Sequence, residues 1–492
     1  MSSLSDLSVV QMISGLKNKD FSSEQLTQAF LNNIDARNDV LNAFITVDPE
    51  KALLQAREAD TRIAQGSMLS VLDGIPIAVK DVFCTKDMRT TAASHILSNF
   101  IPEYDATVVA KIKEAGMVIL GKNNMDEFSM GSSNIFSYYG PSINPWKTKS
   151  DVDFCRVPGG SSGGSAVSVS ARMTPLSMGG DTGGSVRQPA ALCGAVGVKP
   201  TYGRCSRYGM IAFSNTLDHP GVLARSVEDA SLLLAIMSGA DLRDNRSVDR
   251  EIDFLDYKEV SHKKLRVAIP ENYLVDMDGM FKQSFYDLVN GLRQQGIECS
   301  FIKLPDPELV MYLYYIISSV EASSNLMRYD GVRYGVRNDV DDLENMYRTT
   351  RSKCFAQEVK NRCFIGASLL HLAQDGIDFY RTSLKVRRYL QDYVQKVFAE
   401  TCDIFLMPTT MRTAYKVTDK LDTIDYYYDD LYTAFANIIG IPATSVPLGL
   451  SEEGLPFGVQ VMSSHFRERK MFSIASVIEN IVNFDDRSTV IS

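Results

Sequence analysis

Two glycine-rich segments that carry serines lie close together in this chain of 492 residues. Residues 159–165 read Gly-Gly-Ser-Ser-Gly-Gly-Ser, and residues 180–185 read Gly-Asp-Thr-Gly-Gly-Ser. Glycine lets the backbone approach a ligand closely and adopt conformations that other residues avoid. Two such loops, each ending at a hydroxyl group, indicate backbone N–H donors gathered around a serine nucleophile.

A lysine upstream of these loops is the candidate base. Lys80 ends the apolar run Ile-Pro-Ile-Ala-Val, which is typical of a buried strand. A serine hydroxyl is a weak nucleophile until a base removes its proton, and a lysine can do this only when it is neutral. Burial lowers the pKa of a lysine toward that state. The alternative is a surface lysine that pairs with Asp81.

The residues alone leave three other interpretations of the glycine-rich loops. A phosphate-binding loop is disfavoured because neither segment ends in the Gly-Lys-Ser/Thr of that motif. A nucleophile elbow fits residues 160–164 formally, but it requires a histidine partner, for which His219, His371 and His465 are the candidates. A flexible linker fits poorly, because the residues after Ser165 are helix-like and uncharged.

The elements that must position these residues alternate between strand and helix patterns, which predicts an α/β fold. Ser22 and Gln25 predict a capping box at the start of an amphipathic helix. We expect one domain whose sheet is built from both ends of the chain. Its parts are N-terminal helices (1–70), a core (71–240), a mostly helical cap insertion (241–400) and C-terminal strands and helices (401–492). Strands are expected at 75–79, 117–120, 265–269, 299–302, 403–407, 444–446 and 458–461, and helices near 22–34, 53–63, 106–115 and 281–292.

Composition excludes several classes of function. The net charge of −9 argues against DNA binding, because phosphate contacts need clustered cations. No segment is apolar and long enough to predict a membrane span, and the N-terminus lacks the pattern of a signal peptide. The eight cysteines are scattered without metal-ligand spacing, so we expect reduced thiols, no metal site and a cytoplasmic protein.

The order of these motifs resembles that of the amidase signature family. The two serine loops are followed by Val-Arg-Gln-Pro-Ala, Cys-Gly and Gly-Val-Lys-Pro-Thr-Tyr-Gly. The resemblance implies an α/β fold with a large mixed sheet of about eleven strands covered by helices on both faces. It also implies a Ser–cis-Ser–Lys triad, with Ser185 as nucleophile, Ser161 as the bridging serine after a cis peptide bond, and Lys80 as base. The oxyanion hole is expected from the backbone of Thr182, Gly183, Gly184 and Ser185.

Further segments resemble the A subunits of tRNA-dependent amidotransferases: residues 121–133, 144–146, 325–335 and 358–366. In that branch free glutamine is held by its two charged ends, which call for an arginine and an acidic residue. The resemblance implies substrate binding by Arg362, Asp430, Tyr314, Met130 and Gly131. The alternatives are a helix-surface arginine at 362 and a helix N-terminal residue at 430. The chain departs from the branch in a longer segment at 147–155 and in Asn361 and Cys363 beside Arg362.

The implied function is hydrolysis of L-glutamine to supply ammonia to a partner. The expected partners are the B and C subunits of a heterotrimer, which would use ATP and Mg²⁺ and contact the tRNA. This chain itself would need no cofactor. The ammonia would amidate mischarged Glu-tRNA(Gln) or Asp-tRNA(Asn). A stand-alone amidase acting on other carboxamides and a non-catalytic assembly scaffold remain the alternatives.

Overall fold

A mixed β-sheet of eleven strands forms the centre of the computed structural model, which describes residues 3–274, 279–340, 342–374 and 378–487. The strands follow the order β1-β3-β2-β4-β6-β5-β10-β11-β9-β7-β8 across the sheet, and helices pack along both faces. The fold class predicted from the resemblance is therefore confirmed. The strands are β1 Phe44–Val47, β2 Pro76–Lys80, β3 Val118–Asn123, β4 Leu176–Asp181, β5 Val196–Lys199, β6 His219–Ala224, β7 Arg266–Pro270, β8 Glu298–Ile302, β9 Ile404–Pro408, β10 Ala443–Leu450 and β11 Pro456–Ser463.

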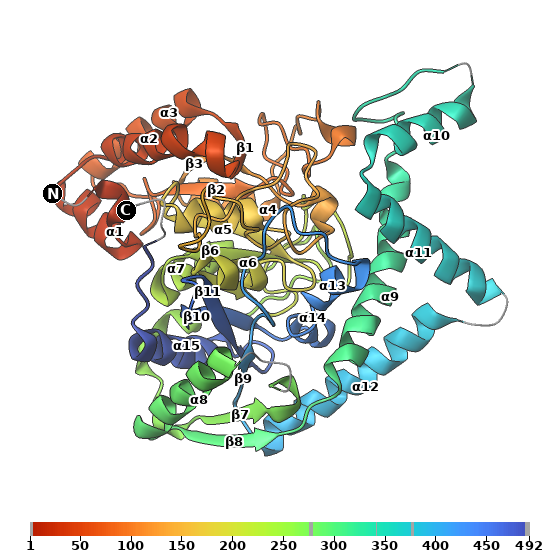
Figure 1. Cartoon of the computed structure of the whole chain (residues 1–492). Helices are drawn as coiled ribbons and strands as arrows, with labels where there is room; N and C mark the ends of the chain where they lie inside the picture. The colour runs from red at the N-terminus through yellow and green to blue at the C-terminus, as the bar shows by residue number, and fades with distance from the viewer. Residues whose placement is uncertain (1–2, 275–278, 341, 375–377, 488–492) are drawn as a thin grey trace.

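The α-helices alternate with these strands and cover the sheet (Figure 1). Helix α5 contacts β2, β3, β4 and β6, and α6 contacts α5, β5, β10 and β11. Helices α7, α8 and α15 form another packed group along the sheet. The helices are α1 Val9–Asn18, α2 Ser23–Leu41, α3 Pro49–Ala64, α4 Thr107–Glu114, α5 Gly163–Ser170, α6 Arg187–Cys193, α7 Val227–Met237, α8 Gly279–Gln294, α9 Pro307–Asn325, α10 Leu343–Cys354, α11 Gln357–Gln374, α12 Phe379–Glu400, α13 Thr423–Tyr428, α14 Ala434–Ile439 and α15 Glu468–Val482.

The N-terminal helices form where the local signals predict them. The Ser22 side chain accepts a hydrogen bond from the backbone of Gln25, and the Gln25 side chain accepts one from the backbone of Ser22, so the capping box at the start of α2 is confirmed. Leu26, Phe30 and Ile34 then recur on one face of α2 and are buried in the main hydrophobic core. This packing places α2 beside α3 and against strands β2 and β3.

Strand pairing at the centre of the sheet brings the lysine and the second glycine loop together. Strands β2 and β4 are parallel neighbours, with Ala78 opposite Ser177 and Val79 opposite Met178. Parallel neighbours end at the same edge of a sheet. Lys80, the last residue of β2, therefore lies beside the loop that leaves β4 at Asp181.

The 241–400 segment contributes both strands and helices. Strands β7 and β8 form one end of the sheet, with β7 beside β9 from the C-terminal part of the chain. Helices α9 to α12 form a separate helical layer along one side of the sheet, and α10 lies at its outer end (Figure 1). A second hydrophobic core lies where α9, α12, α14 and β9 meet. This layer carries side chains of the candidate site.

Strands β1, β4, β5 and β6 are absent from the sequence predictions. Strand β6 contains Pro220 and Gly221, and β5 contains Gly197, residues that weaken a strand pattern read from sequence alone. Strand β6 forms despite this weak pattern because it pairs with both β4 and β5. Within the described ranges, none of the helices is both long enough and apolar enough to span a membrane.

Candidate active site

Lys80 and Ser161 form a buried hydrogen-bonded pair at the end of β2. The Nζ of Lys80 lies 2.8 Å from the Oγ of Ser161 and 3.3 Å from the carbonyl oxygen of Gly180. Both side chains are fully buried. The sequence prediction of a buried lysine beside the serine loops is confirmed, and a surface ion pair with Asp81 is excluded. Asp81 lies instead 3.5 Å from the ammonium group of another buried lysine, Lys122.

Burial also allows Lys80 to act as a base, because it favours the neutral amine over the charged ammonium group. Burial lowers its pKa to about 7, although the carboxylates of Asp126, Asp181 and Asp218 act in the opposite direction. An ordinary lysine is almost entirely charged at neutral pH, whereas a lysine with a pKa of about 7 is half neutral there. A neutral Lys80 can accept the proton of the hydroxyl that it contacts.

The two serine loops are joined through their backbones. The peptide bond between Gly160 and Ser161 is cis, as the resemblance implies. The backbone N–H of Ser162 donates to the carbonyl oxygen of Ser185 at 3.1 Å, and the Ser162 hydroxyl donates to the carbonyl oxygen of Gly180 at 3.1 Å. These bonds place Ser185 in the same buried region as Ser161, with only 4 % of its surface exposed.

The loop before Ser185 is held rigidly from both sides. Arg187 contacts Asp181 through two nitrogens at 3.1 Å, and the hydroxyl of Thr182 donates to Asp218 at 2.7 Å. The hydroxyl of Thr433 donates to the carbonyl oxygen of Gly183 at 2.7 Å. This leaves the backbone fixed by side chains around it, as oxyanion binding requires.

The amides of this loop are available to a ligand. Gly184 adopts a φ of 139°, which favours glycine, and a Cβ there would overlap the Thr433 side chain. Over the described ranges, the structure shows no acceptor for the backbone N–H groups of Gly183, Gly184 and Ser185. Buried N–H groups without a partner are uncommon, and they suit the stabilisation of an oxyanion.

Arg362 is a buried residue of α11 and not a helix-surface arginine. Its Nε donates to Glu358 at 2.6 Å, and its guanidinium carbon lies 4.5 Å and 4.8 Å from the ring centres of Tyr315 and Tyr427. Only 3 % of the residue is exposed, yet its Nη1 has no hydrogen-bond partner in the described structure. An unpaired donor on a buried arginine suits a ligand carboxylate.

Asp430 lies between α13 and α14 and is buried beside two hydroxyl groups. The Ser132 hydroxyl donates to its Oδ1 at 2.9 Å, and the Tyr315 hydroxyl donates to its Oδ2 at 2.7 Å. Burial raises the pKa of Asp430 to about 6, against the lowering effect of these two donors. The residue is therefore largely ionised at neutral pH, and its charge suits a ligand ammonium group.

The remaining predicted residues, Tyr314, Gly131 and Met130, differ in how close they lie to the candidate site. A Cβ on Gly183 would overlap the ring of Tyr314, so this buried tyrosine packs against the second serine loop. Gly131 lines a cavity together with Arg362. Met130 is fully buried in the main core and does not line that cavity.

This cavity has a volume of about 150 Å³ and lies between the 131–136 loop and α11. It is large enough for part of a small ligand, and its wall is both aromatic and charged. Sequence reasoning missed Ser132, Glu358, Tyr426 and Tyr427 in this wall. It also missed Tyr315, which contacts Asp430 and Arg362 beside the cavity. The tyrosine-rich character of the 307–430 region was the available signal. The lining residues are Gly131, Ser132, Phe136, Gln357, Glu358, Asn361, Arg362, Tyr426 and Tyr427.

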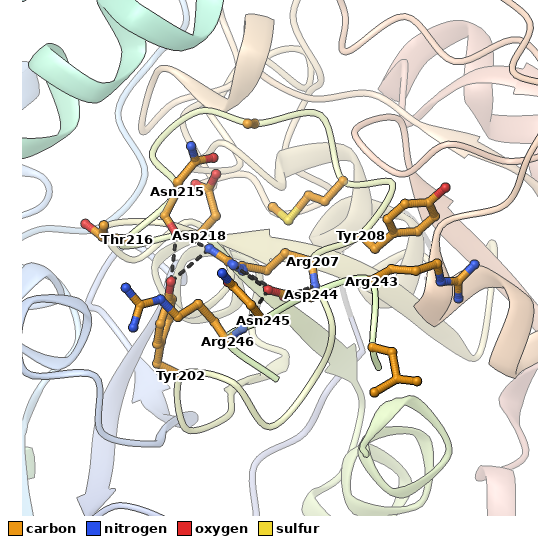
Figure 2. Close-up of a pocket in the computed structure, with 13 residues that line it drawn as sticks. Tyr202, Arg207, Tyr208, Asn215, Thr216, Asp218, Arg243, Asp244, Asn245 and Arg246 are labelled. Carbon is orange, nitrogen blue, oxygen red and sulfur yellow. Dashed lines mark hydrogen bonds and ion pairs between the residues drawn. The ribbon is translucent and has the colours of Figure 1, made fainter. Parts of the chain in front are cut away.

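A second, wider hollow of about 570 Å³ is lined in part by Asp218, the residue that accepts the hydrogen bond from Thr182 (Figure 2). Its wall includes three arginines, but Arg207 is paired with Asp244 and Arg243 with Asp241. None of the predicted site residues lines it. The serine and lysine residues predicted from the sequence therefore lie outside the wall of this hollow.

The histidines do not support a nucleophile elbow. His219 is buried, and its Nδ1 contacts the carbonyl oxygens of Asp181 and Leu217, while its Nε2 has no partner in the described structure. The Nε2 of His465 contacts the carbonyl oxygen of Ile439. Over the described ranges, no histidine is bonded to a hydroxyl of the two loops, and no group of three or more His, Cys, Asp or Glu residues is placed to bind a metal.

Comparison with known proteins identifies the family. The amidase family model matches residues 25–472. The chain belongs to the amidase family. It is 45 % identical over 485 residues to the A subunit of the glutamyl-tRNA(Gln) amidotransferase of Wolbachia sp. subsp. Brugia malayi, and the match covers 97 % of this chain and 98 % of that protein. The resemblance stated from the sequence motifs is confirmed.

Two solved amidase structures resemble this chain along nearly its whole length. The A subunit of the glutamyl-tRNA(Gln) amidotransferase of Thermotoga maritima is 37 % identical, with a TM-score of 0.80 over 99 % of this chain and 97 % of that one. The native peptide amidase of Stenotrophomonas maltophilia is 27 % identical, with a TM-score of 0.84 over 99 % of both chains. The amidase fold is therefore common to proteins that are named for different activities, and the site must decide between them.

Proposed function

We propose that this chain hydrolyses the side-chain amide of L-glutamine and supplies the ammonia to a tRNA-dependent amidotransferase. The observation that carries the proposal is a cavity at which a buried arginine has a free donor and a buried aspartate lies nearby. Arg362 and Asp430 are the two charges that a free amino acid requires, one for its carboxylate and one for its ammonium group. The identity over nearly the full chain to the A subunits of glutamyl-tRNA(Gln) amidotransferases supports the same function.

The proposed reaction begins with the neutral form of Lys80. Lys80 accepts the proton of Ser161, Ser161 accepts the proton of Ser185, and the Ser185 oxygen attacks the carboxamide carbon of glutamine. The negative charge on the carboxamide oxygen is stabilised by backbone N–H groups between Thr182 and Ser185. Loss of one such donor in other hydrolases costs about 3 kcal/mol.

The tetrahedral intermediate then releases ammonia. Protonated Lys80 returns the proton through Ser161 to the leaving nitrogen, and an acyl-enzyme ester remains on Ser185. Water attacks this ester by the same proton route and releases glutamate. Chemistry of this kind needs no cofactor on this chain.

The proposed assembly divides the work between subunits. B and C subunits complete a heterotrimer in the cytoplasm, and the partner activates mischarged Glu-tRNA(Gln), or Asp-tRNA(Asn), with ATP and Mg²⁺. The net charge of −9 on this chain fits tRNA contacts made mainly by the partner. Within the proposed glutamine site, Tyr314 packs against the loop of residues 182–185 (the oxyanion loop), and Gly131 lines the cavity. Met130 supports Gly131 from the hydrophobic core and does not line the cavity itself.

A stand-alone amidase is the second candidate, and the structural likeness to a peptide amidase favours it. The two functions predict different behaviour of the purified chain. Ammonia release from L-glutamine that rises when partner subunits and mischarged tRNA are added supports the amidotransferase. Rapid hydrolysis of other carboxamides by the chain alone, with little glutamine activity, would replace it with the stand-alone enzyme.

The Ser185→Ala variant separates ammonia supply from amidation. In the assembled complex it should lose glutamine-dependent amidation and keep amidation supported by added ammonium, because only the first needs the nucleophile. The measurement is amidated tRNA formed with each nitrogen donor. Equal loss of both activities in a folded complex would contradict the role of ammonia donor.

A further inference from the structure

Glu358 and Arg362 form an ion pair at the wall of the candidate glutamine cavity. They lie one turn apart on α11, with the Nε of Arg362 2.6 Å from the Oε1 of Glu358. Both residues are buried and both line the cavity. A buried ion pair is costly to form from water, so this one needs a reason beyond the stability of the helix.

The two ends of the Arg362 guanidinium have different surroundings. The guanidinium is a rigid planar group whose five N–H bonds point in fixed directions. Its Nε hydrogen is used by Glu358, whereas Nη1, which lies on the opposite side from that hydrogen, is buried and has no partner in the described structure. Its face lies against Tyr315 and Tyr427, whose rings stack 4.2 Å apart.

The start of α11 is itself fixed to the body of the protein. The backbone N–H of Ala356, the residue before the helix, donates to the Oε2 of Glu127 at 2.9 Å. Glu127 belongs to the segment that leads into the Met130–Gly131 backbone. Glu358 therefore has a defined position relative to the cavity. Its hydrogen bond with Nε holds the Arg362 guanidinium in a defined position as well.

We propose that Glu358 is a positioning residue for substrate binding. Its carboxylate holds Arg362 by the Nε hydrogen so that Nη1 is presented to the α-carboxylate of the bound amino acid. This inference rests on the proposed glutamine hydrolysis and names a residue that the family resemblance did not assign. Glu358 and the substrate carboxylate use different hydrogens of one guanidinium, so they bind together and do not compete.

The test is the Glu358→Gln variant of this chain, assayed in complex with the proposed B and C subunits. The glutamine side chain has nearly the same shape but lacks the charge that fixes the arginine. Two substrates are compared: L-glutamine, and 4-aminobutanamide, which is glutamine without its α-carboxylate. The matched control is Glu344→Gln, which makes the same change in the exposed Glu344–Arg348 pair of α10, also one turn apart.

The expected result is specific to the carboxylate. A hydrogen bond between charged groups contributes to substrate binding, and without Glu358 the Arg362 guanidinium is no longer aligned with the α-carboxylate of L-glutamine. The KM for L-glutamine should therefore rise about tenfold, with kcat changed less than about twofold. The kcat/KM for 4-aminobutanamide should change less than about twofold, because that substrate makes no contact with Arg362. The Glu344→Gln control should match the wild-type enzyme with both substrates.

Other outcomes overturn the inference in distinguishable ways. A lower KM for L-glutamine would show that Glu358 competes with the substrate, and an unchanged KM would show that it has no part in binding. Equal losses with both substrates would reduce Glu358 to a structural residue of α11. A wild-type enzyme that fails to hydrolyse L-glutamine would instead overturn the proposed function, and this inference with it.

Discussion

Acidification should switch off glutamine hydrolysis by charging Lys80. In the folded chain, burial lowers the pKa of this lysine from the ordinary 10.5 to about 7. The proton route needs the neutral amine, because a charged ammonium group cannot accept the proton passed from Ser185 through Ser161. Activity should therefore be high above pH 7 and fall as the pH is lowered through the pKa of Lys80.

The size of the effect follows from the position of that pKa. A lysine with a pKa of 10.5 is neutral in about one molecule in three thousand at pH 7, whereas one with a pKa of about 7 is neutral in half. Burial thus raises the population of the active form about a thousandfold. At pH 6 about one molecule in ten remains neutral, so kcat should fall about fivefold between pH 7 and pH 6 and about tenfold more by pH 5.

The assay is ammonia release at saturating L-glutamine between pH 5 and pH 8.5. Saturation isolates kcat, which reports groups in the enzyme–substrate complex, from kcat/KM, which also reports substrate binding. Burial raises the pKa of Asp430 to about 6. Protonation of Asp430 removes the charge that faces the ammonium group, so kcat/KM should fall more steeply than kcat below pH 6.

One variant tests whether protonation of Lys80 causes the fall in kcat at low pH, the acidic limb of the pH profile. The carboxylate of Asp218 raises the pKa of Lys80, so Asp218→Asn should move the acidic limb to lower pH. The asparagine oxygen can replace only one of the two carboxylate oxygens that accept from Thr182 and from the backbone of Phe213 and Ser214, so the fold of this variant must be checked. A circular dichroism spectrum at each pH, with recovery of activity at pH 7.5, excludes unfolding as the cause. A kcat that stays constant from pH 8 to pH 6, or rises on acidification, would refute the reasoning.

Three further variants test other parts of the site. Arg362→Ala should raise the KM for L-glutamine at least about tenfold with a smaller effect on kcat, and an unchanged KM in steady-state assays would remove Arg362 from the site. Lys80→Ala should lower kcat nearly as far as Ser185→Ala, and a substantial residual rate would point to another base. Gly184→Ala should lower kcat strongly, because the new methyl group would overlap Thr433 and φ is unfavourable, while ammonium-dependent amidation persists. Wild-type glutaminase activity in this last variant would contradict the proposed geometry of the oxyanion loop.

The sequence alone predicted the chemistry and identified the general fold. Glycine-rich loops, a lysine after an apolar strand and the capping box at Ser22 are local patterns, and local patterns depend on residues that are close in the chain. The order of motifs then identified the family, which the comparison confirmed. Strand β2 and helix α2 lie where these patterns predict them.

The tertiary structure decided which residues meet. Strand β6 was missed because Pro220 and Gly221 obscure its pattern, and only its pairing with β4 and β5 makes it a strand. The neutral form of Lys80 depends on the burial supplied by the whole sheet, which no spacing reveals.

The same holds for the substrate cavity. Tyr315 of α9 meets Asp430, which lies more than a hundred positions further along the chain, and Glu358 holds Arg362 within α11. Each is an unremarkable residue in the sequence, since a tyrosine or a glutamate on a helix has many possible partners. The packing of α9, α11 and the loop before α14 selects one partner for each, because a buried polar group is stable only when it is paired.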